Sequence, residues 1–479
     1  MGDGADNAST VSIVVLAGQV ISVQQIGLPL LLAVSIFMQM LDVTILNTAL
    51  PAIAQDFQQP VMTMQSAVVS YVLTVAVCIP LTSYLSDRFG TRRMFIWAMS
   101  LFGLGSLLCA LAGSLSALVA ARVVQGLGGA LLTPVARLVL MRRFQGPVLL
   151  RALNYAVMPA LMGPLLGPLL GGYLVEQASW HWIFLMNLPF VVLALALSLK
   201  IMPNYTQQGS QLDVFGVLLL GGAAFLLTLG LELTATSLSL WASVAIVLVS
   251  TLLFFMYWRH AQRHPKAIYP LHLWQVRTYR IGLNSNFLTR VGVASIPLLL
   301  PLLFQVVFSY SPLQAAWLLV PMALAAMLAK PLLLPMLRIV GYKKVLLWNT
   351  GLIGLLLAGL ALLSIQTPKW YIVIHLFLLG MANSIQFTAI NTLTVADLRP
   401  HQKSSANSLM AMNQQLAMGL GTALGAMLVR FNEFLLMDAA AGLYRGFQLT
   451  FVLLGAFTWL AGGLFRYLHD HDGIHMAVK

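Results

Sequence analysis

Long apolar segments alternate with short polar ones along nearly the whole chain. A helix of about 20 apolar residues is long enough to cross the hydrocarbon core of a bilayer. The pattern therefore predicts fourteen membrane-spanning helices, near residues 28–50, 65–85, 94–114, 117–140, 150–175, 181–202, 214–234, 239–258, 280–308, 313–336, 344–364, 370–395, 404–429 and 447–467. The earlier apolar run at 11–20 is too short for a span and has no basic residues before it. We expect residues 1–26 to form an extension that lies at the interface or stays loose.

The loops between these segments divide sharply by charge. Most basic residues fall in loops on one side: Arg88, Arg92, Arg93, Arg142, Arg143, Lys200, Arg259, Arg263, Lys266, Arg277, Arg280, Arg338, Lys343, Lys344, Arg399 and Lys403. The opposite loops carry Lys369, Arg430 and Arg445. Because basic loops stay in the cytoplasm, this bias predicts that both termini are cytoplasmic.

The composition narrows the class of protein. Of 479 residues, 59% are hydrophobic and 8% are charged, which excludes a soluble domain of this size. A net charge of +13 could indicate nucleic-acid binding, but the basic residues lie singly between apolar runs. We therefore expect a lipid bilayer around the chain and no nucleic-acid partner. Cys78 and Cys109 lie inside apolar runs and suit small buried thiols.

Two observations bear on energy source and chemistry. The chain contains no GxxxxGK[ST] motif, which argues against a nucleotide-driven pump. It also has no set of nucleophilic or metal-binding residues at the membrane interface, so we expect neither an enzyme nor a cofactor or metal. The tail HDHD at 469–472 could hold a metal weakly, but a solvated polar end is the preferred interpretation.

The two halves of the chain resemble each other weakly. The segment FGTRR at 89–93 follows the second predicted span, and VGYKK at 340–344 follows the tenth. This repeat predicts two related bundles around a cavity, with two extra spans between them. The expected divisions are an extension (1–26), a six-helix bundle (27–203), two linker helices with a loop (204–279), a second six-helix bundle (280–468) and a cytoplasmic tail (469–479).

The segment 158–172 in the fifth span, MPALMGPLLGPLLGG, repeats glycine and proline every four residues. Residues four apart share one face of a helix, and small residues there let another helix approach closely. Each proline removes a backbone donor, so we expect the helix to bend or soften. A tight helix crossing is the simplest interpretation. The repeated residues are Gly163, Pro164, Gly167, Pro168, Gly171 and Gly172. A weaker copy, Ala417, Gly421 and Gly425, lies in the thirteenth span.

Asp42 is the one carboxylate placed well inside a predicted span, in LDVTILNTALP at 41–51. An acid inside a membrane is costly and by default indicates function. Burial favours its protonated form and a nearby cation favours its charged form, so such an acid can bind and release a proton. Arg122, in the fourth span, is the expected partner. If the first span ends near Pro51, Asp42 lies about 13 Å and Arg122 roughly 8 Å below the same surface. A purely structural ion pair is the alternative.

A charge cluster follows the second span, in SYLSDRFGTRR at 83–93. We expect Asp87 to accept a hydrogen bond from an arginine of its own loop and to lie near a helix end of the other bundle. Such a contact would act as a latch that breaks when the bundles move. The corresponding position in the second half is Arg338, so one latch is expected. The residues assigned to this cytoplasmic gate are Asp87, Arg88, Gly90, Arg92 and Arg93.

Further polar residues in the spans are candidates for a substrate cavity: Asn47, Gln125, Arg290, Asn413 and Gln414. Arg290 falls near the midplane without an evident acidic partner. It could bind an anionic group of a substrate or interact with carbonyl groups. The many methionines, among them Met410 and Met418, would form an adaptable apolar wall.

Taken in order, these motifs resemble the fourteen-span drug:proton antiporters of the major facilitator superfamily, the EmrB/QacA group, and within it the HsrA-type transporters. The likeness covers residues 27–467. The segment 41–51 resembles the family's LDxTIVNxALP, 83–93 its GxxxDRxGRR with Ser83 for the first Gly, and 121–126 its arginine three residues before Gln-Gly. The Gly-Pro repeat resembles the antiporter motif of the fifth helix, and WHWIFLMNLP at 180–189 is also similar to the family.

The resemblance implies an all-α membrane protein with the major facilitator fold, in a bacterial inner membrane. It implies export of small amphipathic compounds in exchange for protons, with the proton gradient as energy source. We expect a monomer and leave open a periplasmic adaptor. Family members that export dications carry extra acids near helices ten and thirteen, where this chain has Lys330 and the segment NQQ at 413–415. Neutral, zwitterionic or anionic substrates therefore fit better. The alternatives are a proton-coupled importer of a metabolite with the same fold, or a membrane sensor that transports nothing.

Overall fold

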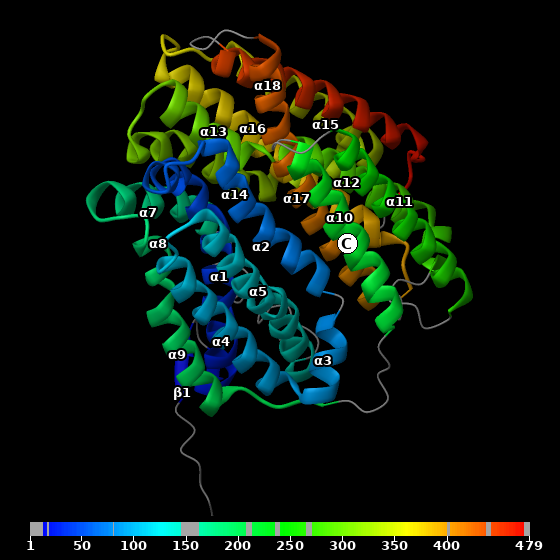
Figure 1. Ribbon diagram of the computed structural model, residues 1–479. Helices are drawn as coiled ribbons and strands as arrows, with labels where there is room; N and C mark the ends of the chain where they lie inside the picture. Colours follow the sequence, from blue (N-terminus) through cyan, green and yellow to red (C-terminus); the bar gives the residue numbers. More distant parts are fainter. Residues whose placement is uncertain are drawn as a thin grey trace, which may run out of the picture.

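The computed structural model describes residues 13–16, 19–79, 81–144, 162–206, 213–234, 240–264, 271–399, 403–436 and 442–473 (Figure 1). After a short N-terminal hairpin, the described chain is helical, and successive helices run back and forth. The fold is all-α, with two helical bundles and two further helices between them.

The N-terminal bundle is built around contacts of α1 with α7 and α9, and of α5 with α2 and α4. Its elements are α1 (Val23–Asp56), η1 (Val61–Met64), α2 (Gln65–Cys78), α3 (Leu81–Phe89), α4 (Thr91–Ala110), α5 (Leu115–Arg143), α7 (Gly163–Gln177), α8 (Trp182–Leu185) and α9 (Asn187–Ile201).

The C-terminal bundle is built around contacts of α12 with α16 and α17, and of α15 with α16 and α18. Its elements are η3 (Leu271–Gln275), α12 (Arg277–Val293), α13 (Ile296–Leu302), the π turn η4 (Leu303–Val307), α14 (Pro312–Val340), α15 (Tyr342–Gly359), η5 (Leu360–Leu362), α16 (Lys369–Ala396), α17 (Lys403–Leu436), α18 (Gly442–Ala461) and η7 (Gly462–Tyr467).

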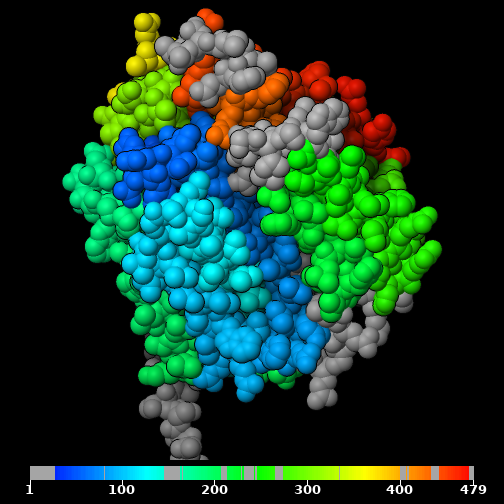
Figure 2. Space-filling model, in the orientation of Figure 1, coloured from blue at the N-terminus to red at the C-terminus, as the bar shows by residue number. Residues whose placement is uncertain are grey.

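Two helices, α10 (Val214–Thr234) and α11 (Leu240–Arg263), lie between the two bundles in the sequence. They pack against each other. Helix α10 also contacts α2 of the first bundle and α17 of the second. Figure 2 shows this pair as a green surface beside the blue surface of the N-terminal bundle. The extra helices therefore cover one side of the line where the bundles meet.

In the described part of the chain, ten helical segments are long and apolar enough to cross a membrane. Each of the four other predicted spans contains one described helix: α7, α10, α11 or α17. The span pattern of the sequence is thus present in the fold. The first residues of the Gly-Pro segment, 158–161, lie outside the described residues.

Helix α1 is longer than the sequence predicts at both ends. It begins at Val23 and continues through Pro51 to Asp56. A helix in a bilayer keeps its backbone bonded within itself, so one missing donor does not end it. Before it, Ile13–Leu16 pairs antiparallel with Gln19–Ser22. The sequence analysis did not predict this β-hairpin, which directly precedes the first span.

Two predicted spans are broken. The described part of the second consists of α2, which ends at Cys78, and α3, which begins at Leu81, with residue 80 outside the described residues. The ninth divides after Val293 into α12, α13 and the π turn η4. Prolines explain the division of the ninth span, because Pro297 and Pro301 lack a backbone donor in α13. The ninth span therefore carries an irregular segment at one end.

The helix ends define two faces of the molecule. We call the basic end the one where α3, α5, α9, α11, α14 and α16 finish, because the basic loops predicted to be cytoplasmic lie there. At this end each bundle has its own apolar core, one with Leu28 and Phe144 and another with Leu337 and Phe465.

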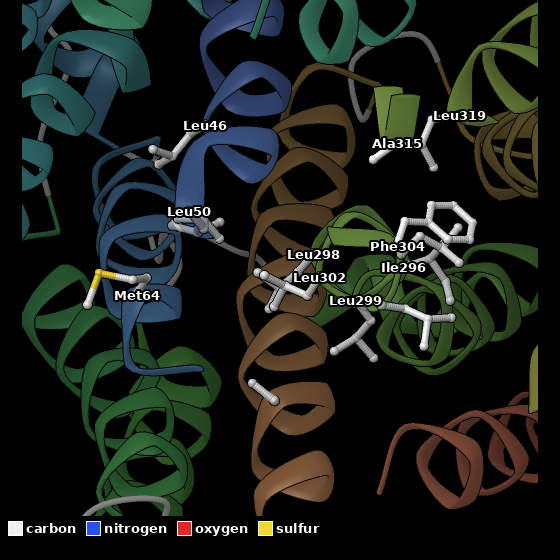
Figure 3. Packing of buried hydrophobic residues seen from close by; sticks show 14 of the residues in the cluster. Leu46, Leu50, Met64, Ile296, Leu298, Leu299, Leu302, Phe304, Ala315 and Leu319 are labelled. Atoms are coloured by element: carbon white, nitrogen blue, oxygen red, sulfur yellow. The ribbon is translucent and has the colours of Figure 1, made fainter. Parts of the chain in front are cut away.

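At the opposite end the bundles share one core. Leu46 and Leu50 of α1 belong to the same buried cluster as Leu298 and Leu302 of α13 (Figure 3). Helix α7 packs on α14 there, and the side-chain amide of Gln305 donates to the Thr48 carbonyl at 3.1 Å. The bundles therefore share a core at the opposite end and have separate cores at the basic end, and α2 of the first bundle also packs on α17 of the second.

The C-terminal tail is tied to the basic end. Arg277 binds Asp472 at 2.5 and 2.8 Å, and Lys343 binds Asp470 at 3.1 Å. The hydrogen bond from Lys343 lowers the pKa of the Asp470 carboxyl below its usual value. The expected solvated tail is thus held to the starts of α12 and α15 through its acids.

Candidate functional site

Asp42 lies in the middle of α1 with 1% of its surface exposed, and Arg122 of α5 is equally buried. One nitrogen of the Arg122 guanidinium (Nη1) is 2.6 Å from Oδ2 of Asp42. One turn earlier on α1, Gln39 donates to the Gly129 carbonyl of α5 at 3.0 Å and holds the two helices together. The structure thus brings the predicted acid and its predicted partner into direct contact.

Neutral polar groups complete a cage around this pair. Gln125 donates to Oδ1 of Asp42 at 2.8 Å, and Asn187 donates to the same oxygen at 3.0 Å. Both amides also contact the Ser106 hydroxyl, at 2.8 and 3.3 Å. The carboxylate therefore accepts hydrogen bonds from α5 and α9 in addition to its ion pair with Arg122.

The guanidinium of Arg122 is held from three further sides. Its Nε donates to the Ala67 carbonyl of α2 at 3.2 Å, and its Nη1 donates to Oε1 of Gln125 at 2.6 Å. The ring of Tyr71 lies 4.3 Å from the guanidinium carbon, in a cation–π contact. Arg122 is thus positioned even without Asp42.

Asn187 and Ser106 did not emerge from the sequence as site residues. Asn187 lies in the segment 180–189, whose tryptophans suggested an interfacial belt, and Ser106 lies in the apolar third span. The available signal was a lone polar residue inside an apolar segment. In a membrane such a residue needs a polar partner.

The glycines of α7 pack on α1 beside Asp42. A Cβ at Gly163 would lie 2.8 Å from Cβ of Met40, and one at Gly171 would lie 2.8 Å from the Ile45 carbonyl. Thr44 of α1 donates to the Gly163 carbonyl at 3.2 Å. Such a backbone-to-backbone crossing leaves no room for a side chain.

The remaining residues of the Gly-Pro motif lie at other contacts. Gly172 faces the C-terminal bundle, where a Cβ would lie 2.8 Å from the Pro312 carbonyl of α14. Pro164 lies in the first turn of α7, where its missing donor costs no helical hydrogen bond, and Pro168 lies inside the helix. The motif thus touches α1 on one side and the opposite bundle on another.

The partner of Asp87 differs from the expected one. Asp87 pairs at 2.7 Å with Arg142, at the end of α5 in the same bundle, and not with an arginine of its own loop. Arg88 instead donates to the Tyr84 hydroxyl at 2.5 Å. Two helix ends of one bundle are therefore joined, which fits the separate cores at the basic end.

The rest of this loop is covered by the segment after α9. Gly90 has φ +92°, and a Cβ there would collide with the Asn204 side chain. The backbone of Arg92 donates to Asn204 at 3.2 Å and its guanidinium donates to the Leu199 carbonyl. Arg93 is exposed. The loop is thus shaped by its own bundle in this conformation.

The candidate cavity residues fall into separate places. Gln125 belongs to the Asp42 cage, and Asn47 is buried with its side-chain oxygen unbonded. Asn413 donates to the Leu283 carbonyl at 3.0 Å, and Gln414 donates to Asn391 at 2.9 Å. These two lie in the C-terminal bundle with Arg290.

Arg290 of α12 has soft partners in place of an acid. Its carbon lies 4.4 Å from the ring centre of Phe387, and its Nη2 lies 4.0 Å from the Met418 sulfur. In the described part of the chain no carboxylate lies within ion-pair distance of it. The two bundles therefore differ, because the buried arginine of the first is paired with an acid.

The model of the Major Facilitator Superfamily matches residues 32–422 and 284–472. "Putative multidrug resistance protein MdtD" of Pectobacterium carotovorum (strain PC1) is 40% identical over 416 residues, covering 86% of this chain and 89% of that protein. The protein of the same name from Escherichia coli O6:H1 (strain CFT073) is 41% identical over 402 residues, covering 83% and 85%.

Solved structures show the same fold at low sequence identity. A D-xylose–proton symporter superposes with a TM-score of 0.67 at 14% identity, over 93% of this chain and 98% of that one. The nucleoside transporter NupG superposes with a TM-score of 0.65 at 12% identity, with the same coverage. At such identities the likeness concerns the fold alone.

Proposed function

Because the chain belongs to the Major Facilitator Superfamily, we propose that it is a proton-coupled exporter of small amphipathic compounds that works by alternating access. The multidrug resistance names of its relatives support export of drug-like compounds. Within the superfamily we assign it to the fourteen-span drug:proton antiporters, on the motifs of its first, second, fourth and fifth spans. The energy source is then the proton gradient.

The observation that carries the proposal is the cage around Asp42. The carboxylate is 1% exposed and is held by Arg122, Gln125 and Asn187. Of these three partners, Arg122 alone is charged. Such a group exchanges a proton only if the cage opens, so protonation and conformation are linked. In this conformation both carboxylate oxygens accept hydrogen bonds.

The difference between the two ends of the molecule supports a direction for this exchange. The bundles share a core at the opposite end and have separate cores at the basic end, which we assign to the cytoplasm on the distribution of basic loops. Asp42 is then deprotonated in the inward-facing state and receives its proton when the opposite end opens. Both termini are cytoplasmic in this orientation, and the membrane is the bacterial inner membrane.

The glycines of α7 serve as a movable seal in this scheme. They contact α1 beside Asp42, and Gly172 contacts α14 across the bundles. A rotation of α7 would thus disturb the acid's helix and the closed end together. We assign the pair of Asp87 and Arg142 to the inward-facing state, and a changed partner for Asp87 to the outward-facing one.

Proton release from acidified inside-out vesicles tests this function directly. We expect amphiphiles from a chemically varied panel to release protons in vesicles with the wild-type protein, and Asp42→Asn to abolish the response at equal protein amount. Asp56→Asn is the matched control, because Asp56 accepts a hydrogen bond from Trp180 outside the cage. It should respond as the wild type does.

Other outcomes would point elsewhere. An unchanged response in Asp42→Asn would refute the role of Asp42 in coupling. Proton-driven accumulation of a compound in right-side-out vesicles would favour an importer, and a protein that moves nothing in either direction would favour a sensor.

A further inference from the structure

The C-terminal bundle repeats the polar frame that surrounds Asp42. In the first bundle, Gln125 of α5 donates to the Ser106 hydroxyl of α4 at 2.8 Å. In the second, Gln386 of α16 donates to the Thr350 hydroxyl of α15 at 2.6 Å. Each bond joins the third and fourth spans of its own bundle. The two frames are therefore built from corresponding helices.

The charged positions of the frame also correspond, but their residues differ. Three residues before the glutamine, α5 has Arg122 and α16 has Asn383. On the first helix of each bundle, α1 has Asp42 and α12 has Arg290. The second frame thus has an arginine where the first has its acid, and an amide where the first has its arginine.

Helix packing supports this correspondence. Gly163 and Gly171 of α7 contact α1 at Met40 and Ile45, on both sides of Asp42. The weaker glycine repeat in α17 packs on α12 in the same way, and a Cβ at Gly421 would lie 2.8 Å from Cβ of Ala294. Arg290 therefore lies in the part of α12 that its bundle's glycine helix covers, as Asp42 does in α1.

The charge of Arg290 is not compensated within this frame. Its Nε is buried without a hydrogen-bond partner in the structure. Arg290 is half-buried, and its cation–π contact with Phe387 offsets only part of the cost of removing a charge from water. An anion placed beside the guanidinium would supply the missing interaction.

A small cavity adjoins Arg290. Its polar lining consists of Asn286, Thr289, Arg290, Asn383 and Gln386, and none of its lining residues is acidic. The space available to the centre of a water molecule is about 20 Å³, which suits the oxygens of one headgroup and not a whole drug. Asn383 is exposed, so the cavity opens beside it.

The surroundings suit an amphipathic ligand. Met418, which contacts the guanidinium, also packs on the apolar core of the N-terminal bundle. An apolar group attached to the headgroup would thus meet a flexible methionine wall where the bundles come together. We propose that this cavity binds the carboxylate or sulfonate of an amphipathic organic anion, and that such anions are the substrate class. This inference rests on the proposed function as an exporter.

Binding of matched ligand pairs to the purified full-length protein tests it without a gradient. The pairs are 1-naphthaleneacetate with 1-naphthaleneacetamide, and indole-3-butyrate with indole-3-butyramide, measured by calorimetry in detergent at neutral pH. The wild-type protein should bind each anion about ten-fold more tightly than its amide, because a hydrogen bond to a charged group is worth about 1.5–3 kcal/mol.

Two variants should remove this preference by different routes. Arg290→Gln removes the cation, and Asn383→Asp places an internal carboxylate in the same cavity. Both should bring the ratio of the two dissociation constants close to one. Arg290→Lys and Asn383→Ala keep the cation without adding an acid, so they should retain most of the preference.

The outcomes separate this inference from the proposed function. Asp42→Asn should keep the preference for anions, since Asp42 lies in the other bundle, even though it abolishes proton release. Equal binding of anion and amide by the wild type, including no binding of either, would overturn the inference. So would a preference that survives Arg290→Gln, or displacement of the organic anions by chloride or phosphate at similar affinity.

Discussion

Asp42 and Arg122 are buried so deeply that neither can lose its partner without consequence. Removing one member of a buried ion pair typically costs about 3–5 kcal/mol, because the other charge is left uncompensated. The Gln125 and Asn187 amides would remain beside an unpaired Asp42. The pair should therefore behave as one unit in stability as well as in transport.

A double-mutant comparison tests this coupling. We expect Arg122→Gln to lower the melting temperature of the detergent-solubilised protein, at a cost of about 3–5 kcal/mol. Adding Asp42→Asn should recover part of this loss, because the buried carboxylate disappears. Thermal unfolding monitored by fluorescence gives both values. A double variant as unstable as the sum of the single ones would mean that the residues act independently.

A separate prediction concerns Asn187. Asn187→Ala removes one donor to the carboxylate, and hydrogen bonds to charged groups contribute about 1.5–3 kcal/mol. We expect a stability loss of that order and slower proton release in vesicles. Asn204→Ala is the control, because Asn204 bonds the loop at Arg92, outside the cage. Similar losses of transport in both variants would argue against a specific role for Asn187.

At the scale of single elements, α7 joins the acid's helix to the closed end. Gly171 is pressed against α1 and Gly172 against α14, so neighbouring positions of one helix face different bundles. A side chain added at Gly172 would act on the contact between the bundles and leave the Asp42 cage intact. A substitution in α7 can therefore alter the contact between the bundles without changing the Asp42 cage.

Gly172→Ala should loosen the closed end. Its Cβ would lie 2.8 Å from the Pro312 carbonyl and 2.9 Å from Cα of Leu313, so the helices must separate. With Cys78 and Cys109 replaced by alanine, Leu313→Cys should react several-fold faster with a membrane-impermeant maleimide in the Gly172→Ala background. Gly113→Ala is the matched control, because nothing lies within 4 Å of its added Cβ. Equal rates in both backgrounds would contradict a seal at Gly172.

For the whole molecule, closure at one end and separate cores at the other define one state of an alternating pair. The shared core of α1 and α13 and the bond from Gln305 to Thr48 hold the opposite end. If a proton on Asp42 favours the other state, removing the charge of Asp42 should close the basic end and open the opposite end.

Spin labels at both ends check this movement. One pair, Lys200→Cys with Ile339→Cys, spans the basic end, and another, Gln59→Cys with Gln366→Cys, spans the opposite end, at exposed positions. In the Asp42→Asn background we expect the first distance to shorten and the second to lengthen. The distances are measured by pulsed electron paramagnetic resonance. Unchanged distances would show that Asp42 does not affect the conformational equilibrium.

Much of the architecture can be predicted from the local sequence. The apolar pattern predicts the spans because a bilayer accepts helices of about 20 residues and satisfies no free backbone groups. The buried acid and the arginine are visible for the same reason, since charges inside spans are rare. The break in the ninth span coincides with prolines visible in the sequence, whereas the extension of α1 and the N-terminal hairpin are less visible, because they depend on how neighbouring segments pack.

By itself, then, the sequence determined the membrane-spanning class, the repeated halves and the identity of the ionisable groups inside the spans. Only the tertiary structure decided their partners: that Asn187 and Ser106 complete the cage of Asp42, that Asp87 binds Arg142, and that Arg290 has a cavity in place of an acid. The physical reason is that hydrophobicity acts along each segment and is read residue by residue, whereas hydrogen bonds and ion pairs act over about 3 Å between helices distant in sequence.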